Sequence, residues 1–426
     1  MSNSCSVSLK NESPVGGVMA WLVCLSAGLF FFYEFFQLNL FDVINQSLRD
    51  DFQIDASQLS WMSSAYVWAN ILFLLPAGIL LDRFSVRRVI LTAMIICIVG
   101  TVGFGFSYSY NWAFTFHFLT GIGNAFCFLS CVVLAARWFP PRRQALVIGS
   151  VVTMAFLGGM MAHTPLAFLN EQFGWRQSLM IDGGVGALLF LWLLFLIKDR
   201  PDVETVLAEE SPVEPLKQAF AYALLNRQNW LCGLYTACLN LPIMVLGALW
   251  GASYLTTVHH LSTISASNVV SCLFFGSMIG CPTIGWVSDT MGRRKFPMFI
   301  GATLTLLAFS PLFFGEMLSS TVLGLIFFAI GFVTSAQVIS YPCIAESNRA
   351  SNTGAATGIA SVIIMGGGGI GQVLFGQLMK SHATIVSNHY SSIDFQFALW
   401  IFPVATMIAL LALIFMRETY CNRVTE

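Results

Sequence analysis

Two side chains in the apolar runs of this sequence could carry a proton. Glu34 lies towards the far end of the run from Met19 to Phe41. A carboxyl group inside such a run is costly when ionised, so it either pairs with another group or titrates. His117 lies in another apolar run, and histidine titrates near neutral pH. We expect Glu34 and His117 to form a proton-coupling pair. The alternative is that His117 is a neutral packing residue while Glu34 binds substrate without coupling.

Uncharged polar side chains at similar positions could recognise a small solute. Amides and hydroxyls can bind the amino and carboxyl groups of a zwitterion. The candidate substrate-binding residues are Glu34, Gln37, Tyr66, Asn70, Asn124, Tyr235, Asn240, Gln337 and Tyr341. For any one of them, a hydrogen bond between helices is an equally good explanation. Asn240 precedes Pro242, so it could also satisfy backbone groups that the proline frees.

The apolar runs contain no lysine or arginine well inside them. A carrier of phosphorylated or multiply anionic compounds normally needs cationic side chains in its cavity. This pattern disfavours sugar phosphates and favours a neutral or zwitterionic small molecule.

Residues typical of metal sites and enzymes are sparse. The eleven cysteines include no CxxC pair, and the adjacent His259 and His260 lack further ligands. We expect His163, which precedes Thr164, to serve packing. Hydrolase and metalloprotease motifs are missing from the sequence, and no basic stretch resembles a nucleic-acid-binding arm. We therefore expect no catalytic residues, no metal, no cofactor and no nucleic-acid partner.

These residues must be positioned by membrane-spanning helices. The chain is 57% hydrophobic and 10% charged, whereas soluble domains carry roughly 25% charged residues. Its apolar runs reach the roughly 20 residues that a helix needs to cross the bilayer. The sequence predicts an all-α membrane protein with twelve spans, in contact with the lipid bilayer. The spans are 19–42, 58–81, 89–108, 112–136, 145–169, 177–197, 230–255, 266–288, 296–316, 320–344, 352–379 and 396–416.

The spans divide into two sets of six around one long polar segment. The predicted parts are a cytoplasmic tail at 1–18, a six-helix bundle at 19–197, a cytoplasmic linker at 198–229, a second bundle at 230–416 and a cytoplasmic tail at 417–426. Only Arg49, Arg176 and Lys380, among the 20 lysines and arginines, fall on the side opposite the termini. The positive-inside rule then places both termini in the cytoplasm. We expect a multi-pass protein of a bacterial inner membrane.

A charged loop motif occurs twice, about half the chain length apart. The first copy contains Gly78, Asp82, Arg83 and Arg87, and the second contains Gly285, Asp289, Arg293 and Arg294. An aspartate at the end of one span can accept hydrogen bonds from arginines and lock that side of the protein. Both copies resemble the loop motif of the major facilitator superfamily. The resemblance implies two six-helix halves, alternating access and a cytoplasmic gate at these residues.

Three further stretches narrow the resemblance. Phe31–Gln37, Phe73–Gly78 and Phe126–Cys131 are similar to the bacterial phagosomal-transporter subfamily. That resemblance implies an importer of a nutrient such as an amino acid or nucleoside, and we expect it to be proton-coupled and monomeric. One alternative is drug or metabolite efflux by proton antiport. Two others are a siderophore carrier and a non-transporting sensor.

Overall fold

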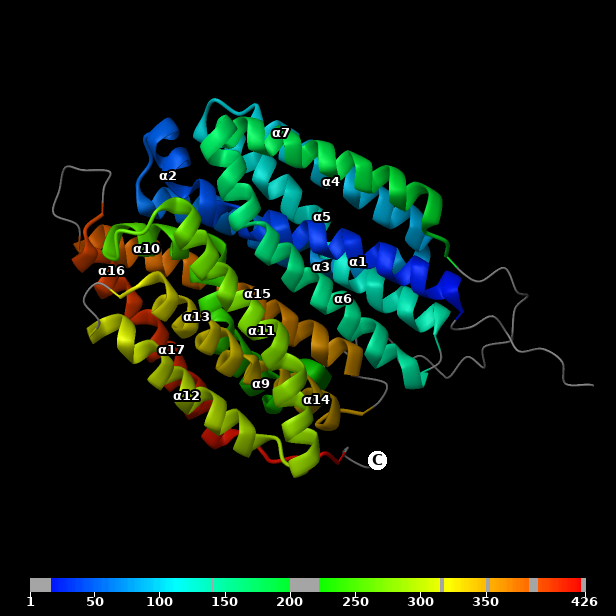
Figure 1. The fold of residues 1–426 in the computed structure, drawn as a ribbon. Helices are drawn as coiled ribbons and strands as arrows, with labels where there is room; N and C mark the ends of the chain where they lie inside the picture. The colour runs from blue at the N-terminus through cyan, green and yellow to red at the C-terminus, as the bar shows by residue number, and fades with distance from the viewer. Residues whose placement is uncertain are drawn as a thin grey trace, which may run out of the picture.

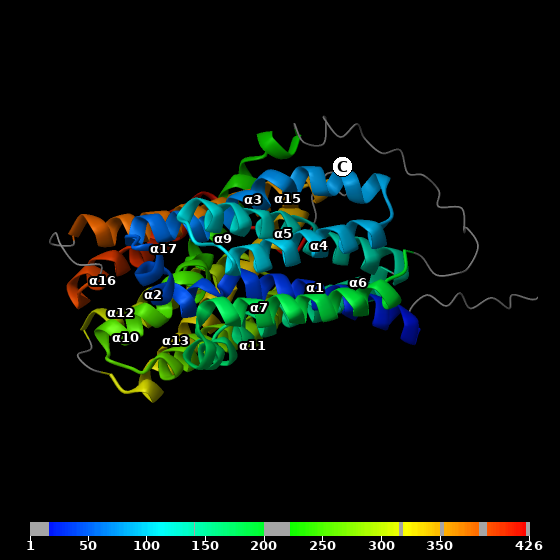
Figure 2. The same cartoon turned by 90° about the horizontal axis from the view of Figure 1, so that it is seen from above.

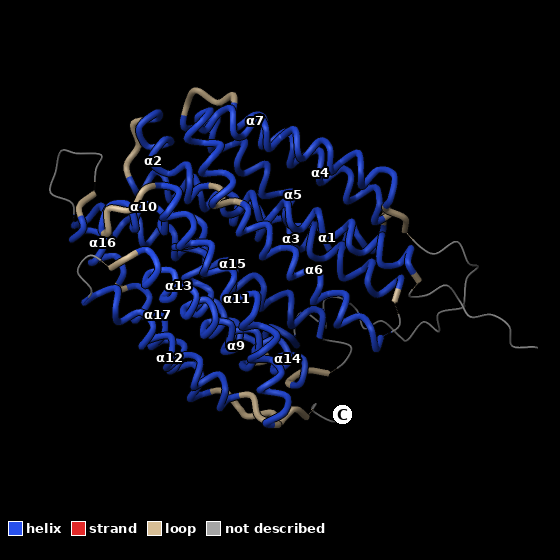
Figure 3. Tube along the Cα trace, viewed as in Figure 1, coloured by secondary structure: helices blue, strands red, loops and turns tan. Residues whose placement is uncertain are grey.

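The computed structural model describes residues 17–139, 141–199, 222–314, 318–349, 353–382 and 390–422. Within these ranges the chain is built from helices and short loops, with no β-strand (Figure 3). The helices of the first half, blue to green, lie beside those of the second half, green to red (Figure 1). The described residues leave out most of the predicted linker, Pro140 and parts of both predicted tails.

The first half contains seven helical segments that make six crossings. They are α1 (Val18–Asn39), α2 (Phe41–Phe52), α3 (Ala56–Arg83), α4 (Val86–Gly105), α5 (Tyr110–Trp138), α6 (Pro141–Met161) and α7 (Thr164–Leu196). Leu40 keeps a helical backbone, so α2 prolongs the first crossing. Gly174 has a φ of 76° inside α7, a conformation that glycine adopts without steric cost. The chain reverses there, so α6 and the start of α7 form the fifth crossing.

The second half repeats this plan with less regular helices. Its elements are α9 (Arg227–Pro242), η1 (Ile243–Trp250), α10 (Gly251–Val258), α11 (Thr263–Met291), α12 (Lys295–Phe314), α13 (Ser320–Thr334), η2 (Ser335–Ile339), α14 (Ser340–Glu346), α15 (Thr353–His382), α16 (Ser392–Leu399) and α17 (Ile401–Phe415). The segment η1 is a π-helix and η2 is a 3-10 helix. Both interrupt single crossings, the seventh and the tenth.

The helices are long and apolar enough to cross a membrane. Ten stretches of the described chain qualify, and one of them, Val147–Leu196, has 50 residues and turns at Gly174. That stretch therefore crosses twice, and α3 supplies a further crossing of 28 residues. The predicted all-α architecture with about twelve spans in two halves is confirmed.

The two halves are joined near the helix ends that lie away from the chain termini. The side chain of Asn45 donates to the Leu249 carbonyl at 2.6 Å, and the Tyr390 hydroxyl accepts from the Ala56 amide at 2.9 Å. One hydrophobic core combines residues of both halves here, including Phe41 and Trp250. In Figure 2 α15 of the second half lies beside α3 of the first half, and the two helices pack on one another. The molecule is therefore closed on the side away from its termini.

Candidate functional site

Glu34 lies at the centre of a polar cluster in the first half. It projects from α1 and is fully buried, with 0% exposure. The Tyr66 hydroxyl, from α3, donates to Glu34 and lies 2.8 Å from its Oε2. Gly121 lets α5 approach the α3 backbone at Tyr66, because a Cβ at this position would lie 2.7 Å from the Tyr66 Cα. Close packing of three helices thus fixes the hydroxyl against the carboxyl group.

The second oxygen of Glu34 has no hydrogen-bond partner in the described structure. It faces Gly123 on α5, where an added Cβ would lie 3.0 Å from it. The Cys97 thiol on α4 interacts with the same carboxyl group. An ionised carboxylate whose second oxygen has only a thiol, a weak donor, near it is unfavourable in an apolar interior. This geometry suits a carboxyl group that exchanges a proton or receives a partner from outside the protein.

A second carboxyl group, Asp182, faces the same helix α1. The Gln37 amide donates to Asp182 Oδ2, and the Tyr33 hydroxyl donates to the Asp182 carbonyl at 3.3 Å. Asp182 lies in α7 and is buried, with 6% exposure. Sequence reasoning missed this residue. The available signal was a single charge inside the apolar run that ends at Ile197.

His117 belongs to the same cluster but does not pair directly with Glu34. Its ring packs against Phe41, Tyr66 and Phe104, with centroid distances of 4.4, 5.4 and 5.7 Å. The ring also interacts with the Ser63 backbone. Among the described residues, no ion pair joins His117 to Glu34. Tyr66 connects them instead, because its hydroxyl binds Glu34 while its ring stacks on His117.

The remaining first-half candidates have mixed surroundings. Asn70 lies one turn after Tyr66 on α3 and is buried. Asn124 is half-buried on α5, and its Oδ1 accepts from the Cys127 thiol of the same helix at 3.3 Å.

The second-half candidates form a separate group. The Tyr235 hydroxyl donates to the Met298 carbonyl of α12 at 2.7 Å, so it serves packing within that half. Asn240 is buried near the end of α9, Gln337 is buried in η2, and Tyr341 of α14 is 38% exposed. The segments α9, η2 and α14 pack on one another. No contact identified in the described residues links this group to Glu34.

The second copy of the loop motif forms a charged cluster. Arg294 donates to Asp289 Oδ1 at 2.6 Å and to Glu346 Oε1 of α14 at 2.6 Å. Burial alone would lower the pKa of Arg294, but the carboxylates of Glu346 and Asp289 raise it above its ordinary value. Glu418 accepts from the backbone amides of Arg294 and Lys295. Sequence reasoning predicted Asp289 and Arg294 but missed both glutamates.

Other motif residues have different partners. Arg87 donates to the Leu194 carbonyl at 2.7 Å, and its amide donates to Asp199, which caps α4. The Arg293 carbonyl accepts from Ser288 at 2.9 Å. The space around the α-carbons of Gly78 and Gly285 is open. The side chains of Asp82 and Arg83 lie outside the described part of the structure.

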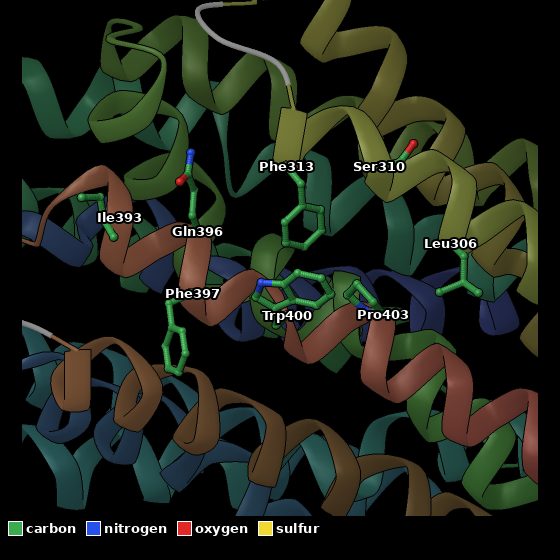
Figure 4. Close-up of a pocket in the computed structure, with 8 residues that line it drawn as sticks. All are labelled: Leu306, Ser310, Phe313, Ile393, Gln396, Phe397, Trp400 and Pro403. Atoms are coloured by element: carbon green, nitrogen blue, oxygen red, sulfur yellow. The ribbon is translucent and has the colours of Figure 1, made fainter.

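A surface hollow lies on the flank of the second half, apart from these clusters. It lies between α12 and the α16–α17 crossing, and Gln396, Phe397 and Trp400 are among its lining residues (Figure 4). None of the predicted substrate residues lines it.

Comparison with known proteins places this geometry in context. The model of the Major Facilitator Superfamily matches residues 23–372 and, separately, residues 236–423. A D-galactonate transporter of Escherichia coli is 22% identical over 304 residues, covering 66% of this chain and 68% of the relative. The membrane sensor protein UhpC of Salmonella typhimurium is 26% identical over 306 residues, covering 67% of this chain and 69% of the relative.

Solved structures share the fold at low sequence identity. A bacterial homologue of the human lysosomal transporter Spinster, in an inward-facing and unoccupied conformation, matches with a TM-score of 0.75 and 17% identity, over 93% of this chain and 98% of that chain. The nucleoside transporter NupG matches with a TM-score of 0.72 and 13% identity, over 93% of this chain and 100% of that chain.

Proposed function

Because the chain belongs to the major facilitator superfamily, we propose that it imports a small neutral or zwitterionic nutrient, such as an amino acid or nucleoside, together with protons. The chain is a multi-pass membrane protein and a secondary transporter, not an enzyme. The cargo, the proton coupling and the direction are our proposal.

The observation that carries the proposal is the buried carboxyl cluster on α1 and α7. Glu34 is held by Tyr66 on one oxygen and has no hydrogen-bond partner on the other. Such a group can hold a proton when buried and release it when water enters. His117 is the basic group of this cluster, joined to Glu34 through Tyr66.

The chemistry of the cluster argues for a neutral or zwitterionic cargo. The partners identified for Glu34 and Asp182 are tyrosine, glutamine and cysteine side chains. No lysine or arginine of the described residues is among them. The names of some relatives refer to organic acids such as D-galactonate, whose carriage would require a cationic partner. An amine of a zwitterion could instead pair with Glu34 or Asp182.

Orientation follows from the lysine and arginine distribution. With both termini in the cytoplasm, the closed side is the outer face of a bacterial inner membrane. The halves would then part towards the cytoplasm to expose the buried cluster, and the protein works as a monomer through alternating access of its two halves.

Replacement of Glu34 tests the coupling. In proteoliposomes with an imposed proton gradient, Glu34→Gln should lose accumulation of the cargo while retaining exchange of labelled for unlabelled cargo. Glu171→Gln, on an exposed position of α7, is the matched control and should accumulate normally. Unchanged accumulation in Glu34→Gln would overturn the proton-coupling proposal.

Identifying the cargo comes first. Thermal stabilisation of the purified protein by a panel of metabolites, beginning with amino acids and nucleosides, should reveal a ligand. Stabilisation only by organic acids would contradict the neutral or zwitterionic cargo.

Three other functions remain as alternatives. An acidic first span and a histidine in the fourth also suit proton-driven efflux or a siderophore carrier, and resistance of cells to dyes would indicate efflux. Similarity to a membrane sensor protein makes a non-transporting receptor the third alternative. Ligand binding without any uptake or exchange would identify that role.

A further inference from the structure

A second buried acid–base pair lies where the two halves meet, apart from Glu34. Asp42 lies in the first turn of α2, and His163 lies between α6 and α7. His163 Nδ1 is 3.4 Å from Asp42 Oδ2, and both side chains have 0% exposure. Asp42 is eight residues beyond Glu34 in the same crossing, roughly 12 Å along a helix.

Asp42 connects the first half to the second. Its Oδ1 accepts from the Ala252 amide at 2.8 Å. Ala252 lies in the first turn of α10, directly after the π-helix η1. α10 continues η1 without a break, and the Gly251 amide bonds back to the Leu246 carbonyl. The carboxylate of one half therefore binds a backbone amide of the other half at the junction of the π-helix and the α-helix.

His163 also contacts both halves. Its ring packs on Phe274 of α11, with centroids 5.2 Å apart. The neighbouring Thr164 hydroxyl donates to Asn268 Oδ1 of α11 at 2.6 Å. The ring packs as the sequence led us to expect, but its acidic neighbour Asp42 in the same half was missed. His163 Nε2 has no hydrogen-bond partner in the described structure.

The charges around the pair are few. Groups facing Asp42 are His163 and the Gly251 and Ala252 amides. The facing groups of α11 are Phe274 and Asn268, which do not titrate near neutral pH. His163 is thus the one titratable partner identified for Asp42 among the described residues.

We propose that Asp42 and His163 are a second proton-binding site of the transport cycle, which must hold one proton for the two halves to close over it. With one proton, the pair is an aspartate and an imidazolium, or an acid and a neutral imidazole, and has no net charge. Without it, closure would bury an unpaired carboxylate, which is unfavourable. When the halves separate, the Ala252 amide leaves Asp42 and the pair exchanges its proton with the solution on that side.

The proposal predicts how closure depends on pH. The closed form binds one proton more than the open form once the pH exceeds the range in which histidine titrates. Closure should therefore weaken as pH rises, by up to about tenfold per pH unit. This inference rests on the proposed alternating access, but not on the identity of the cargo.

Hydrogen exchange of residues 243–258 measures closure directly, because this segment contains η1 and the Ala252 amide. We would follow it in the purified full-length protein, without cargo or gradient, between about pH 6 and about pH 8. After correction for the intrinsic pH dependence of exchange, wild-type protection should fall as pH rises. Asp42→Asn retains an acceptor for Ala252 without a charge, so its protection should no longer fall as pH rises. His163→Gln should lose protection at a more acidic pH than wild type.

Asn45→Ala is the matched control. It removes the 2.6 Å hydrogen bond between Asn45 of α2 and Leu249 of η1, which lies within the same measured segment and involves no titratable group. Its protection should be lower at every pH, with the wild-type slope. A wild-type slope in Asp42→Asn would overturn the proposal, as would a flat profile in Asn45→Ala.

If Asp42→Asn does not fold, His163→Gln carries the test, and a wild-type profile in that variant would overturn the proposal. Glu34→Gln should keep the wild-type slope. Loss of proton-driven uptake in Glu34→Gln therefore tests the proposed function separately from this site.

Discussion

The two halves share one architecture but differ in where they hold charge and where their helices are irregular. The first half buries Glu34, Asp182 and His117 on regular α-helices. The corresponding candidates of the second half are neutral, and its seventh and tenth crossings contain the π-helix η1 and the 3-10 helix η2. Irregular turns inside helices often mark functional hinges. The difference suggests that the first half performs proton chemistry while the second half supplies movement.

Contacts from outside the π-helix support this division. The carbonyls of Leu249 and Met244 in η1 accept from Asn45 of α2 and Gln372 of α15, at 2.6 and 2.8 Å. Gln372 also accepts from the Ser63 hydroxyl of α3 at 3.2 Å, and Ser63 interacts with His117. A polar path therefore runs from the proton cluster to the irregular helix.

We expect the largest effect on transport from Asp182→Asn in the first half. Asparagine can still accept from Gln37, so the fold is retained and only the charge is lost. A hydrogen bond to a neutral acceptor is weaker than one to a charged acceptor by about 1–1.5 kcal/mol, so transport should fall roughly fivefold to tenfold. Initial uptake rates in proteoliposomes measure this. The control, Gln337→Asn in the second half, should change affinity without changing the pH profile. Equal pH shifts in both variants would contradict the division of roles.

Close packing in the first half provides the next prediction. In Gly121→Ala the new methyl group would meet the rigid backbone of Tyr66. Overpacking of this kind costs about 1–3 kcal/mol, so the thermal midpoint should drop and the Glu34 site should loosen. Gly285→Ala, where nothing lies within 4 Å of the added Cβ, is the control and should unfold like wild type. Thermal unfolding in detergent measures both.

The sequence predicted features that depend on composition and local spacing. Long apolar runs determine the spans, and the repeated motif indicated Asp289 and Arg294 as partners. The structure confirms the architecture and shows those two residues bonded. Glu34, Tyr66 and His117 also lie together, although through Tyr66 rather than as a direct pair.

Contacts between distant segments could not be predicted in the same way. Asp182 is separated from Gln37 by 145 residues, and Asp42 from Ala252 by 210 residues. No local pattern states which helix faces meet. Pro242 indicated an irregular helix, but the eight residues of π-helix that follow depend on side chains from α2 and α15.

Two tyrosine replacements, one in each half, test the same difference between the halves, with smaller expected effects on stability. Tyr66→Phe removes the hydroxyl from Glu34, and Tyr235→Phe removes the one from the Met298 carbonyl. Each loss should cost about 0.5–1.5 kcal/mol of stability. Only Tyr66→Phe should shift the pH dependence of uptake, because only it changes a titrating group. A pH shift in Tyr235→Phe would place proton chemistry in the second half as well.

The exposed ion pair between the halves should have the smallest effect. Lys380 Nζ lies 2.8 Å from Asp55 Oδ2, with side chains 57% and 29% exposed. Partial burial raises the pKa of Asp55, but the hydrogen bond and charge of Lys380 outweigh it and lower the pKa below its ordinary value. Its contribution to closure is therefore full at neutral pH and is lost as pH falls through the lowered pKa of Asp55.

Lys380→Gln should weaken closure slightly at neutral pH, and added salt should have a similar effect on wild type, because exposed pairs are screened. The dependence on pH is opposite in sign to that proposed for Asp42 and His163, since acid weakens this pair and favours the buried one. Hydrogen exchange of residues 243–258, measured at several salt concentrations and pH values, distinguishes the contributions of the two pairs. A large, salt-insensitive loss of protection in Lys380→Gln would mean that the exposed pair of Lys380 and Asp55, rather than the buried pair of Asp42 and His163, controls closure.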